Sequence, residues 1–160
     1  MYNYYLNGGY FVMPSSRAGA DGSMGFSFSS LPPYHNYNTR FQPFDKLEVS
    51  GNYRIFLGVE DNNLSKHGFG DYADKGANAK YILFHPEESD YRLPGVAVGA
   101  EDFMGTQLFG AQYIVATYVR PEYNFEVSVG YGNKRFNGLF GGMTWMPWWK
   151  ERASWLQKLA

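Results

Sequence analysis

The chain has 160 residues, 14 of them basic and 15 acidic, so it carries no overall charge that would hold a nucleic acid or an anionic membrane surface. The absence of cysteine excludes disulfides, thiolate catalysis and cysteine-bound zinc. The 14 Tyr, 13 Phe and 19 Gly are high for this length and indicate a β-rich protein. No stretch approaches the ~18 consecutive apolar residues of a membrane-spanning helix. The start, MYNYYLNGGYF, lacks the basic and apolar regions of a secretory signal.

From Gly22 onward the chain divides into short segments separated by Gly, Pro, Asn and Asp, as antiparallel strands and turns do. Residues 24–29, 47–57 and 77–83 each place apolar side chains on one face and polar or small ones on the other. The alternation is clearest in residues 47–57. The polar face of these strands would carry Glu48, Asn52, Arg54, Asn78 and Lys80.

The stretch PGVAVGAEDFMGT, residues 94–106, begins as a strand and then places two carboxylates side by side. Glu101 belongs to the polar face of this strand. Asp102 and Gly105 fit positions i and i+3 of a type I turn, so we expect Asp102 to form a turn. Because neighbouring strand residues point to opposite faces, the two carboxylates should diverge, which argues against the acid pair of a glycosidase.

Later strands bring the predicted number to about eight. Residues 111–119 are apolar on both faces, residues 125–132 alternate cleanly, and residues 137–146 are rich in glycine and ambiguous. Pro121 fits the second position of a turn between two of these strands. The polar face here would carry Gln112, Asn124 and Glu126.

No metal, cofactor or catalytic site is predicted. The long polar connection 59–75 resembles a calcium loop in composition, but Lys66 stands where the EF-hand needs glycine and no closing glutamate follows. His35, His67 and His85 are scattered without the spacing of metal ligands. We therefore expect the protein not to be an enzyme.

The only helical pattern lies at the end of the chain, in residues 148–160. Its apolar residues recur at helical spacing, which predicts an amphipathic tail following a sheet domain of residues 1–147. Docking of the tail at a membrane interface and packing under the sheet both remain open.

The alternating pattern is shared by water-soluble sheets and by outer-membrane barrels, whose apolar residues face lipid and whose interior is polar. Tyr123 and Tyr131 mark the two ends of one predicted strand on the same face. Their separation is roughly 26 Å along the strand, or about 20 Å when tilted, close to the ~25 Å apolar band of such barrels. This length favours the membrane interpretation, with outer-membrane lipid as the partner.

Four segments occur in order and at similar spacing in one known family: GYFVMPSSRAGADG, DKGANAK, LPGVAVGAEDFMGTQLFGAQYIVAT and NGLFGGMTWMPW. The chain resembles the YjbH-like family of outer-membrane β-barrel proteins associated with exopolysaccharide production. The most specific pattern consists of Pro94, Ala97, Gly99, Asp102, Gly105 and Thr106. Family members are several times longer and usually carry a signal sequence, so the resemblance covers an N-terminal portion.

The resemblance implies an outer-membrane location and a role in secreting or modifying extracellular polysaccharide, with exopolysaccharide and other secretion proteins as partners, and it implies no catalytic residues. We expect an all-β antiparallel meander that forms a barrel or the first part of a larger one, its sheet open at the first and last strands. The polar residues would line a wet interior, or a track for a sugar polymer. A soluble sandwich or small barrel binding a ligand or carbohydrate, and a carbohydrate-active enzyme, remain as alternatives.

Overall fold

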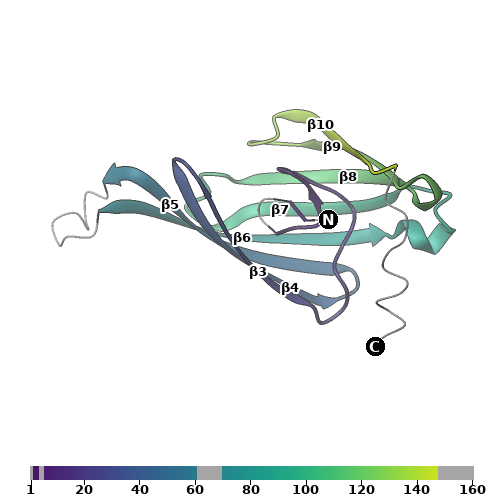
Figure 1. The fold of residues 1–160 in the computed structure, drawn as a ribbon, viewed down its shortest axis with the longest axis horizontal. Helices are drawn as coiled ribbons and strands as arrows, with labels where there is room; N and C mark the ends of the chain where they lie inside the picture. The colour runs from purple at the N-terminus through teal and green to yellow at the C-terminus, as the bar shows by residue number, and fades with distance from the viewer. Residues whose placement is uncertain (1, 4–5, 61–69, 148–160) are drawn as a thin grey trace.

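The computed structural model describes residues 2–3, 6–60 and 70–147. Its main feature is one curved antiparallel sheet, in which each strand pairs with its neighbours in sequence (Figure 1). The strands are β3 (Met24–Leu31), β4 (Tyr34–Phe44), β5 (Leu47–Glu60), β6 (Asp71–Phe84), β7 (Gly95–Gly105), β8 (Ala111–Arg120), β9 (Phe125–Gly132) and β10 (Gly138–Trp145). The expected meander of about eight strands is confirmed. The sheet is not closed into a barrel, because β3 and β10 are its two outer strands.

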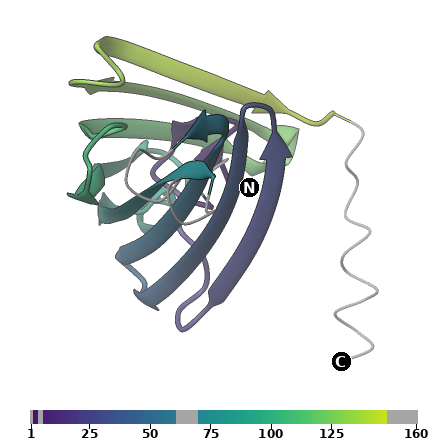
Figure 2. The same cartoon turned by 90° about the vertical axis from the view of Figure 1, so that its left-hand side faces the viewer.

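The chain before β3 crosses the concave side of the sheet. It contains a short hairpin of β1 (Gly9–Tyr10) and β2 (Met13–Pro14). Figure 2 shows this part of the chain inside the curve of the sheet. We call residues 6–23 the N-terminal segment. It gives the sheet a covered concave face and an open convex face.

Burial in the sheet is the reverse of that in an ordinary water-soluble domain, where apolar side chains fill the interior and charged side chains are almost never fully buried unless paired. In β5, Glu48 and Arg54 are buried while Tyr53 between them is 39% exposed. Lys80 and Gln42 are among the largest fully buried side chains. The period of two predicted from the sequence is present, and the concave, covered face is the polar one.

A small apolar core completes the concave face where β6 to β10 lie under the N-terminal segment. It consists of Ile82, Ala97, Tyr113, Val115 and Phe140, with Met13, Ala18 and Phe136 packed against it. Two glycines make room for its rings, since a Cβ on Gly99 would overlap Tyr113 and one on Gly130 would overlap Phe140. The core is too small to account for the whole interior, which is mostly polar.

A bulge in β7 overturns the expected position of Asp102. Ala100 pairs with Ala79 and Met104 with Ala77, so three residues of β7 oppose the single Asn78. Asp102 has a φ of 48° and is buried within the strand; it does not form the β7–β8 turn, which spans residues 106–110. The extra residues also break the alternation, so Glu101 and Asp102 are both buried on the concave side and do not diverge.

Other connections differ less from expectation. Pro121 begins the 3₁₀ turn η3 (Pro121–Tyr123) between β8 and β9, which confirms it as a turn residue. A second turn, η2 (Pro86–Ser89), lies between β6 and β7. The polar connection is shorter than predicted, because β5 continues to Glu60 and β6 begins at Asp71. The predicted tail, 148–160, lies outside the described residues. In the described part of the chain, no helix has the length and apolarity to cross a membrane.

Candidate functional site: the polar face under the N-terminal segment

The centre of the concave face is a buried ion pair that binds the N-terminal segment. Lys80 Nζ lies 3.0 Å from Glu48 Oε1. Lys80 Nζ also donates to the carbonyl oxygens of Gly8 (3.0 Å) and Arg17 (2.5 Å), and the Gly8 N–H donates to Glu48 Oε1 (3.0 Å). A Cβ on Gly8 would overlap the Arg17 carbonyl oxygen, so the close approach requires glycine. The pair thereby satisfies backbone groups that the sheet itself does not pair.

A second group of hydrogen bonds joins the segment to β5 and β6. Ser50 Oγ donates to Asn7 Oδ1 (2.6 Å), and Asn78 Nδ2 donates to Ser50 Oγ (2.9 Å) and to Asn52 Oδ1 (3.1 Å). Asn78 Oδ1 in turn accepts from the Asp102 N–H in the bulge (2.8 Å). Buried polar groups are costly unless they are paired, so this network fixes the segment and the bulge together.

Strands β8 and β9 hold the segment through hydroxyl groups on the concave face. Tyr10 Oη lies 2.9 Å from Ser128 Oγ, and the Ser16 N–H donates to Thr117 Oγ1 (2.8 Å). Thr117 Oγ1 and Ser128 Oγ are 2.7 Å apart, which links these two anchors. Burial raises the pKa of Tyr10 far above its usual value, with the neighbouring Ser128 hydroxyl opposing this shift. The phenol is therefore held neutral.

Further ion pairs lie around the concave face: Arg17 with Glu126 (2.5 Å), Arg54 with Asp74 (3.5 Å) and Arg135 with Glu101. Most of these groups are buried, where removing one partner of a pair costs far more than the pair itself contributes. Arg54 also lies over the ring of Phe109, 3.8 Å from its centre. Phe109 stacks on Phe56, so an aromatic cluster closes this part of the concave face.

Most polar residues selected from the sequence lie together on this face. The buried ones are Glu48, Asn52, Arg54, Asn78, Lys80, Glu101 and Glu126. The position expected for Gln112 is wrong: it is exposed on the convex side of β8, where Asn133 Nδ2 donates to its Oε1 (3.0 Å). The inward residues of this strand include Tyr113 and Thr117. Asn124 was expected on the polar face of a strand. It instead follows η3, has a φ of 48° and is half-buried.

The sequence expectations omitted several members of the site. Strand β4 contributes Asn36, Asn38, Arg40 and Gln42, all buried. Their spacing of two residues is the same signal that identified β5, but the asparagines and Pro43 have low strand propensity and obscure it. The N-terminal segment contributes Asn7, Ser15 and Ser16. It has no alternation, so only its position in the fold identifies it as part of the site.

The N-terminal segment covers the polar residues of the concave face in the described part of the chain. Glu101 and Asp102 border a void of only about 10 Å³, enough for one water molecule at most. Arg135 binds Glu101, and Asp102 Oδ2 accepts from the Phe109 N–H (2.9 Å). Among the described residues, no group of three or more His, Asp or Glu side chains is arranged to hold a metal ion.

The fold and site define a curved antiparallel sheet with an apolar outer face and a polar inner face occupied by its own N-terminal segment. Residues 1–154 match the family model described as "Exopolysaccharide biosynthesis protein YbjH". The chain is also 32% identical over 124 residues to the Escherichia coli (strain K12) protein named "Uncharacterized lipoprotein YjbH"; the match covers 74% of this chain and 17% of that protein. No solved structure matches. The chain belongs to the YjbH family, which is related to exopolysaccharide biosynthesis.

Proposed function

We propose that this chain forms the N-terminal part of an outer-membrane β-barrel with a non-enzymatic role in exopolysaccharide export or biogenesis. The observation that carries this proposal is the reversed burial of the sheet. Phe26, Val129 and Leu139 on the convex face are 73%, 57% and 80% exposed, while Glu48 and Lys80 on the concave face are buried. Large exposed apolar surfaces are unfavourable in water, whereas outer-membrane barrels place such a surface against lipid.

Aromatic side chains on the convex face support a membrane environment. Phe28, Tyr37 and Tyr53 form a row across β3, β4 and β5, with ring centres 5.0 and 6.4 Å apart. All three rings are exposed. Barrels carry girdles of such rings where the membrane meets water. The longer strands, of 10 to 14 residues, reach or exceed the ~9–11 residues of a spanning strand.

The open edges of the sheet fit a larger barrel. The outer edges of β3 and β10 have no strand partner among the described residues. Unpaired edges promote aggregation, and membrane barrels avoid them by closure. The E. coli relative is much longer, since the match covers 17% of it. Further strands of a longer protein would close the barrel, and the name "lipoprotein" given to that relative supports an envelope location for this chain.

The covered concave face limits how a polymer could pass. Lys80 and Glu48 are bound to the N-terminal segment and are not open to a sugar chain. A route along the concave face would therefore exist only after the segment moves. Charged groups and hydroxyls freed by that movement would offer hydrogen bonds to a sugar polymer.

The membrane part of the proposal is tested by Val129→Arg. Val129 is near the middle of β9, and its exposed side chain contributes little to internal packing. Arginine at the membrane midplane costs about 2–4 kcal/mol, but is nearly neutral on a surface in water. We expect Val129→Arg to reduce recovery in the carbonate-washed membrane fraction.

The matched control is Tyr123→Arg, because Tyr123 is 68% exposed in the η3 turn at one end of the sheet. It should insert nearly as well as the unmodified chain, since substitutions near the interface cost about 0–1 kcal/mol. Equal recovery of both variants, or soluble monomer without detergent, would instead favour a water-soluble sheet whose convex face is covered by another protein layer.

A further inference from the structure

Two cavities lie at the end of the sheet formed by the β4–β5, β6–β7 and β8–β9 connections. They have volumes of about 310 and 340 Å³, within the lower range of ligand sites. Arg17, where the N-terminal segment leaves the concave face, contributes to both. Arg17 is fixed there by its ion pair with Glu126. The two cavities therefore share one lining residue.

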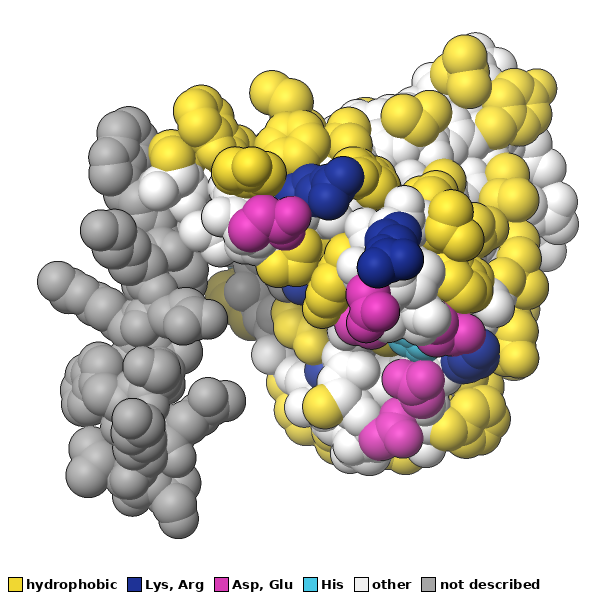
Figure 3. Space-filling view, turned by 90° about the vertical axis from the view of Figure 1, so that its right-hand side faces the viewer, with side chains coloured by type: hydrophobic (Ala, Val, Ile, Leu, Met, Phe, Trp, Pro, Cys, Tyr) yellow, Lys and Arg dark blue, Asp and Glu magenta, His cyan; other side chains and the backbone are white. Residues whose placement is uncertain are grey.

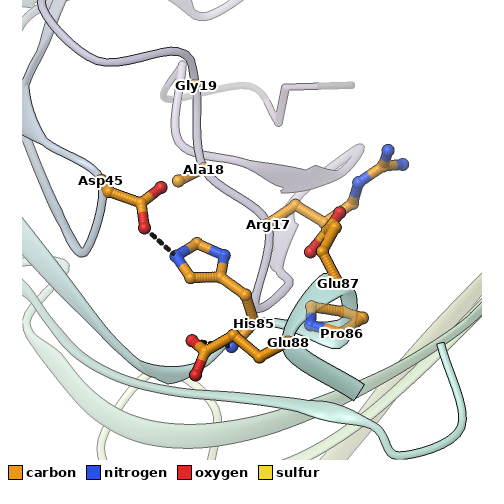
Figure 4. A pocket seen from close by; sticks show the side chains of 8 residues that line it. All are labelled: Arg17, Ala18, Gly19, Asp45, His85, Pro86, Glu87 and Glu88. Carbon is orange, nitrogen blue, oxygen red and sulfur yellow. Dashed lines mark hydrogen bonds and ion pairs between the residues drawn. The ribbon is translucent and has the colours of Figure 1, made fainter. Parts of the chain in front are cut away.

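The first cavity is rich in hydrogen-bonding groups. In Figure 4 the His85 imidazole and the Asp45 carboxylate face each other, with Nε2 and Oδ2 3.2 Å apart. Glu87 and Glu88 line the same cavity. Figure 3 shows this end of the molecule, where acidic and basic side chains gather around a recessed histidine among hydrophobic ones. Carboxylates outnumber cations in the cavity, which disfavours an anionic ligand.

The second cavity has a mixed lining, in which apolar side chains alternate with charged and polar ones that include Glu126 and Thr144. Its members besides Arg17 include Tyr91, Val119, Phe125, Met146, Arg120 and Asn124. Aromatic rings offer a flat apolar surface for a ligand that also carries hydroxyl groups. The first cavity thus supplies mainly hydrogen-bonding groups, and the second supplies both hydrogen-bonding groups and apolar contact.

Tyr91 is held in an unfavourable backbone conformation at the border of the second cavity. Asp90 and Tyr91 have φ values of 50° and 60°, a left-handed conformation that is unusual for a bulky side chain. The Tyr91 N–H donates to the Pro86 carbonyl (2.9 Å), and its hydroxyl donates to Glu87 Oε1 (3.4 Å). Such strain persists where the surrounding structure imposes it and is concentrated at functional sites. The strain therefore favours a binding role for this ring.

We infer that the two cavities bind a neutral, hydroxyl-rich saccharide segment, an inference that rests on the proposed function. The Tyr91 ring would contact the apolar face of a sugar, and Asp45, His85 and Glu87 would bind hydroxyl groups. Arg17 lines both cavities and would contact a bond that links successive sugars. Acidic sugars would be repelled by the carboxylates of the first cavity.

The inference is tested with the detergent-solubilised chain and saturation-transfer NMR, using maltohexaose and cellohexaose as neutral probes and an oligogalacturonide as the acidic one. The informative variant is Tyr91→Gly. Glycine accepts a positive φ without strain, so the variant should be no less stable than the unmodified chain. We expect at least a fivefold loss of saturation transfer to the neutral probe, because the ring is gone.

Tyr123→Gly is the matched control, since Tyr123 is an exposed tyrosine of the same end of the sheet that lines neither cavity. It should leave binding unchanged. Absence of transfer to both neutral probes, stronger transfer to the acidic probe, or an equal loss in both variants would overturn the inference. Because membrane insertion is measured separately with Val129→Arg, failure of saccharide binding would leave the barrel proposal standing.

Discussion

Lys80 Nζ and Glu48 Oε1 lie 3.0 Å apart in a part of the sheet closed to solvent, and both side chains bind backbone groups of Gly8. A buried ion pair alone adds little stability, because desolvation offsets the attraction. Here the pair has a further consequence: Glu48 accepts from the Gly8 N–H, and Lys80 donates to the Arg17 carbonyl and adds a second donor for the Gly8 carbonyl, which also accepts from the Ser15 N–H. The pair therefore determines where that segment lies.

Removing one charge of this pair should be much more harmful than removing both. Lys80→Met leaves Glu48 buried without its cation, which should cost about 3–5 kcal/mol. The double variant Glu48→Gln with Lys80→Met removes both charges, and we expect a smaller loss. Urea unfolding in detergent micelles measures the two free energies, and hydrogen exchange of residues 6–17 reports release of the segment. Equal losses in the single and double variants would contradict this account.

The close contact after the bulge of β7 can be tested at Gly105, the last residue of this strand. Gly105 has a φ of 119°, and a Cβ there would overlap the Lys75 carbonyl oxygen. Gly138 has nearly the same φ, 120°, but open space around it. Both alanine variants carry backbone strain of roughly 1–3 kcal/mol, and only Gly105→Ala adds the collision. Gly105→Ala should therefore unfold at a distinctly lower urea concentration than Gly138→Ala. Identical unfolding midpoints for the two variants would show that the contact with the Lys75 carbonyl does not affect stability.

Tyr10 should make binding of the N-terminal segment sensitive to alkaline pH. Burial raises its pKa, Glu126 raises it further, and Ser128 and Arg17 oppose the shift. Since the pKa is higher in the folded state, the stability from the neutral phenol is complete below about pH 10 and is lost as the pH rises through the folded pKa. Protease cleavage within the segment should stay constant up to about pH 10 and increase above it. The increase should be shallower in Tyr10→Phe, and parallel curves would exclude Tyr10 as the cause.

A disulfide would test whether the segment must move for export. Ser16 and Thr117 are both fully buried, and the Ser16 amide lies 2.8 Å from Thr117 Oγ1. Because the chain has no cysteine, Ser16→Cys with Thr117→Cys would create the only thiol pair in it. In the full-length protein we expect oxidation to lower exopolysaccharide output and reductant to restore it. Ser16→Cys alone is the control. Unchanged output in the oxidised double variant would mean that polymer does not follow the concave face.

The strand pattern shows how far the sequence determines this fold. In β5 the residues Glu48, Asn52 and Arg54 share one face, as their spacing requires, and the neighbouring strands follow the same rule. β4 obeys it too, but was not among the strands expected because its asparagines and Pro43 resemble a turn. In β8 both faces are apolar, so the pattern could not place Gln112 correctly.

The local sequence around Asp102 is not sufficient to predict its structure. Its neighbours Gly105 and Thr106 resemble a turn, and the sequence has no signal that separates a turn from a bulge at this point. In the bulge, the Asp102 N–H donates to the Asn78 side chain of the adjacent strand. That partner is 24 residues away in the chain.

In the strands that alternate cleanly, such as β5 and β9, the sequence by itself determined which side chains share a face of the sheet, because a period of two residues is a local property of an extended backbone. Only the tertiary structure decided which face is covered and by what. The cover comes from contacts between residues far apart in the chain, 40 residues for Gly8 with Glu48 and 118 for Tyr10 with Ser128. A segment without periodicity of its own cannot reveal such contacts until the strands that hold it have been brought together.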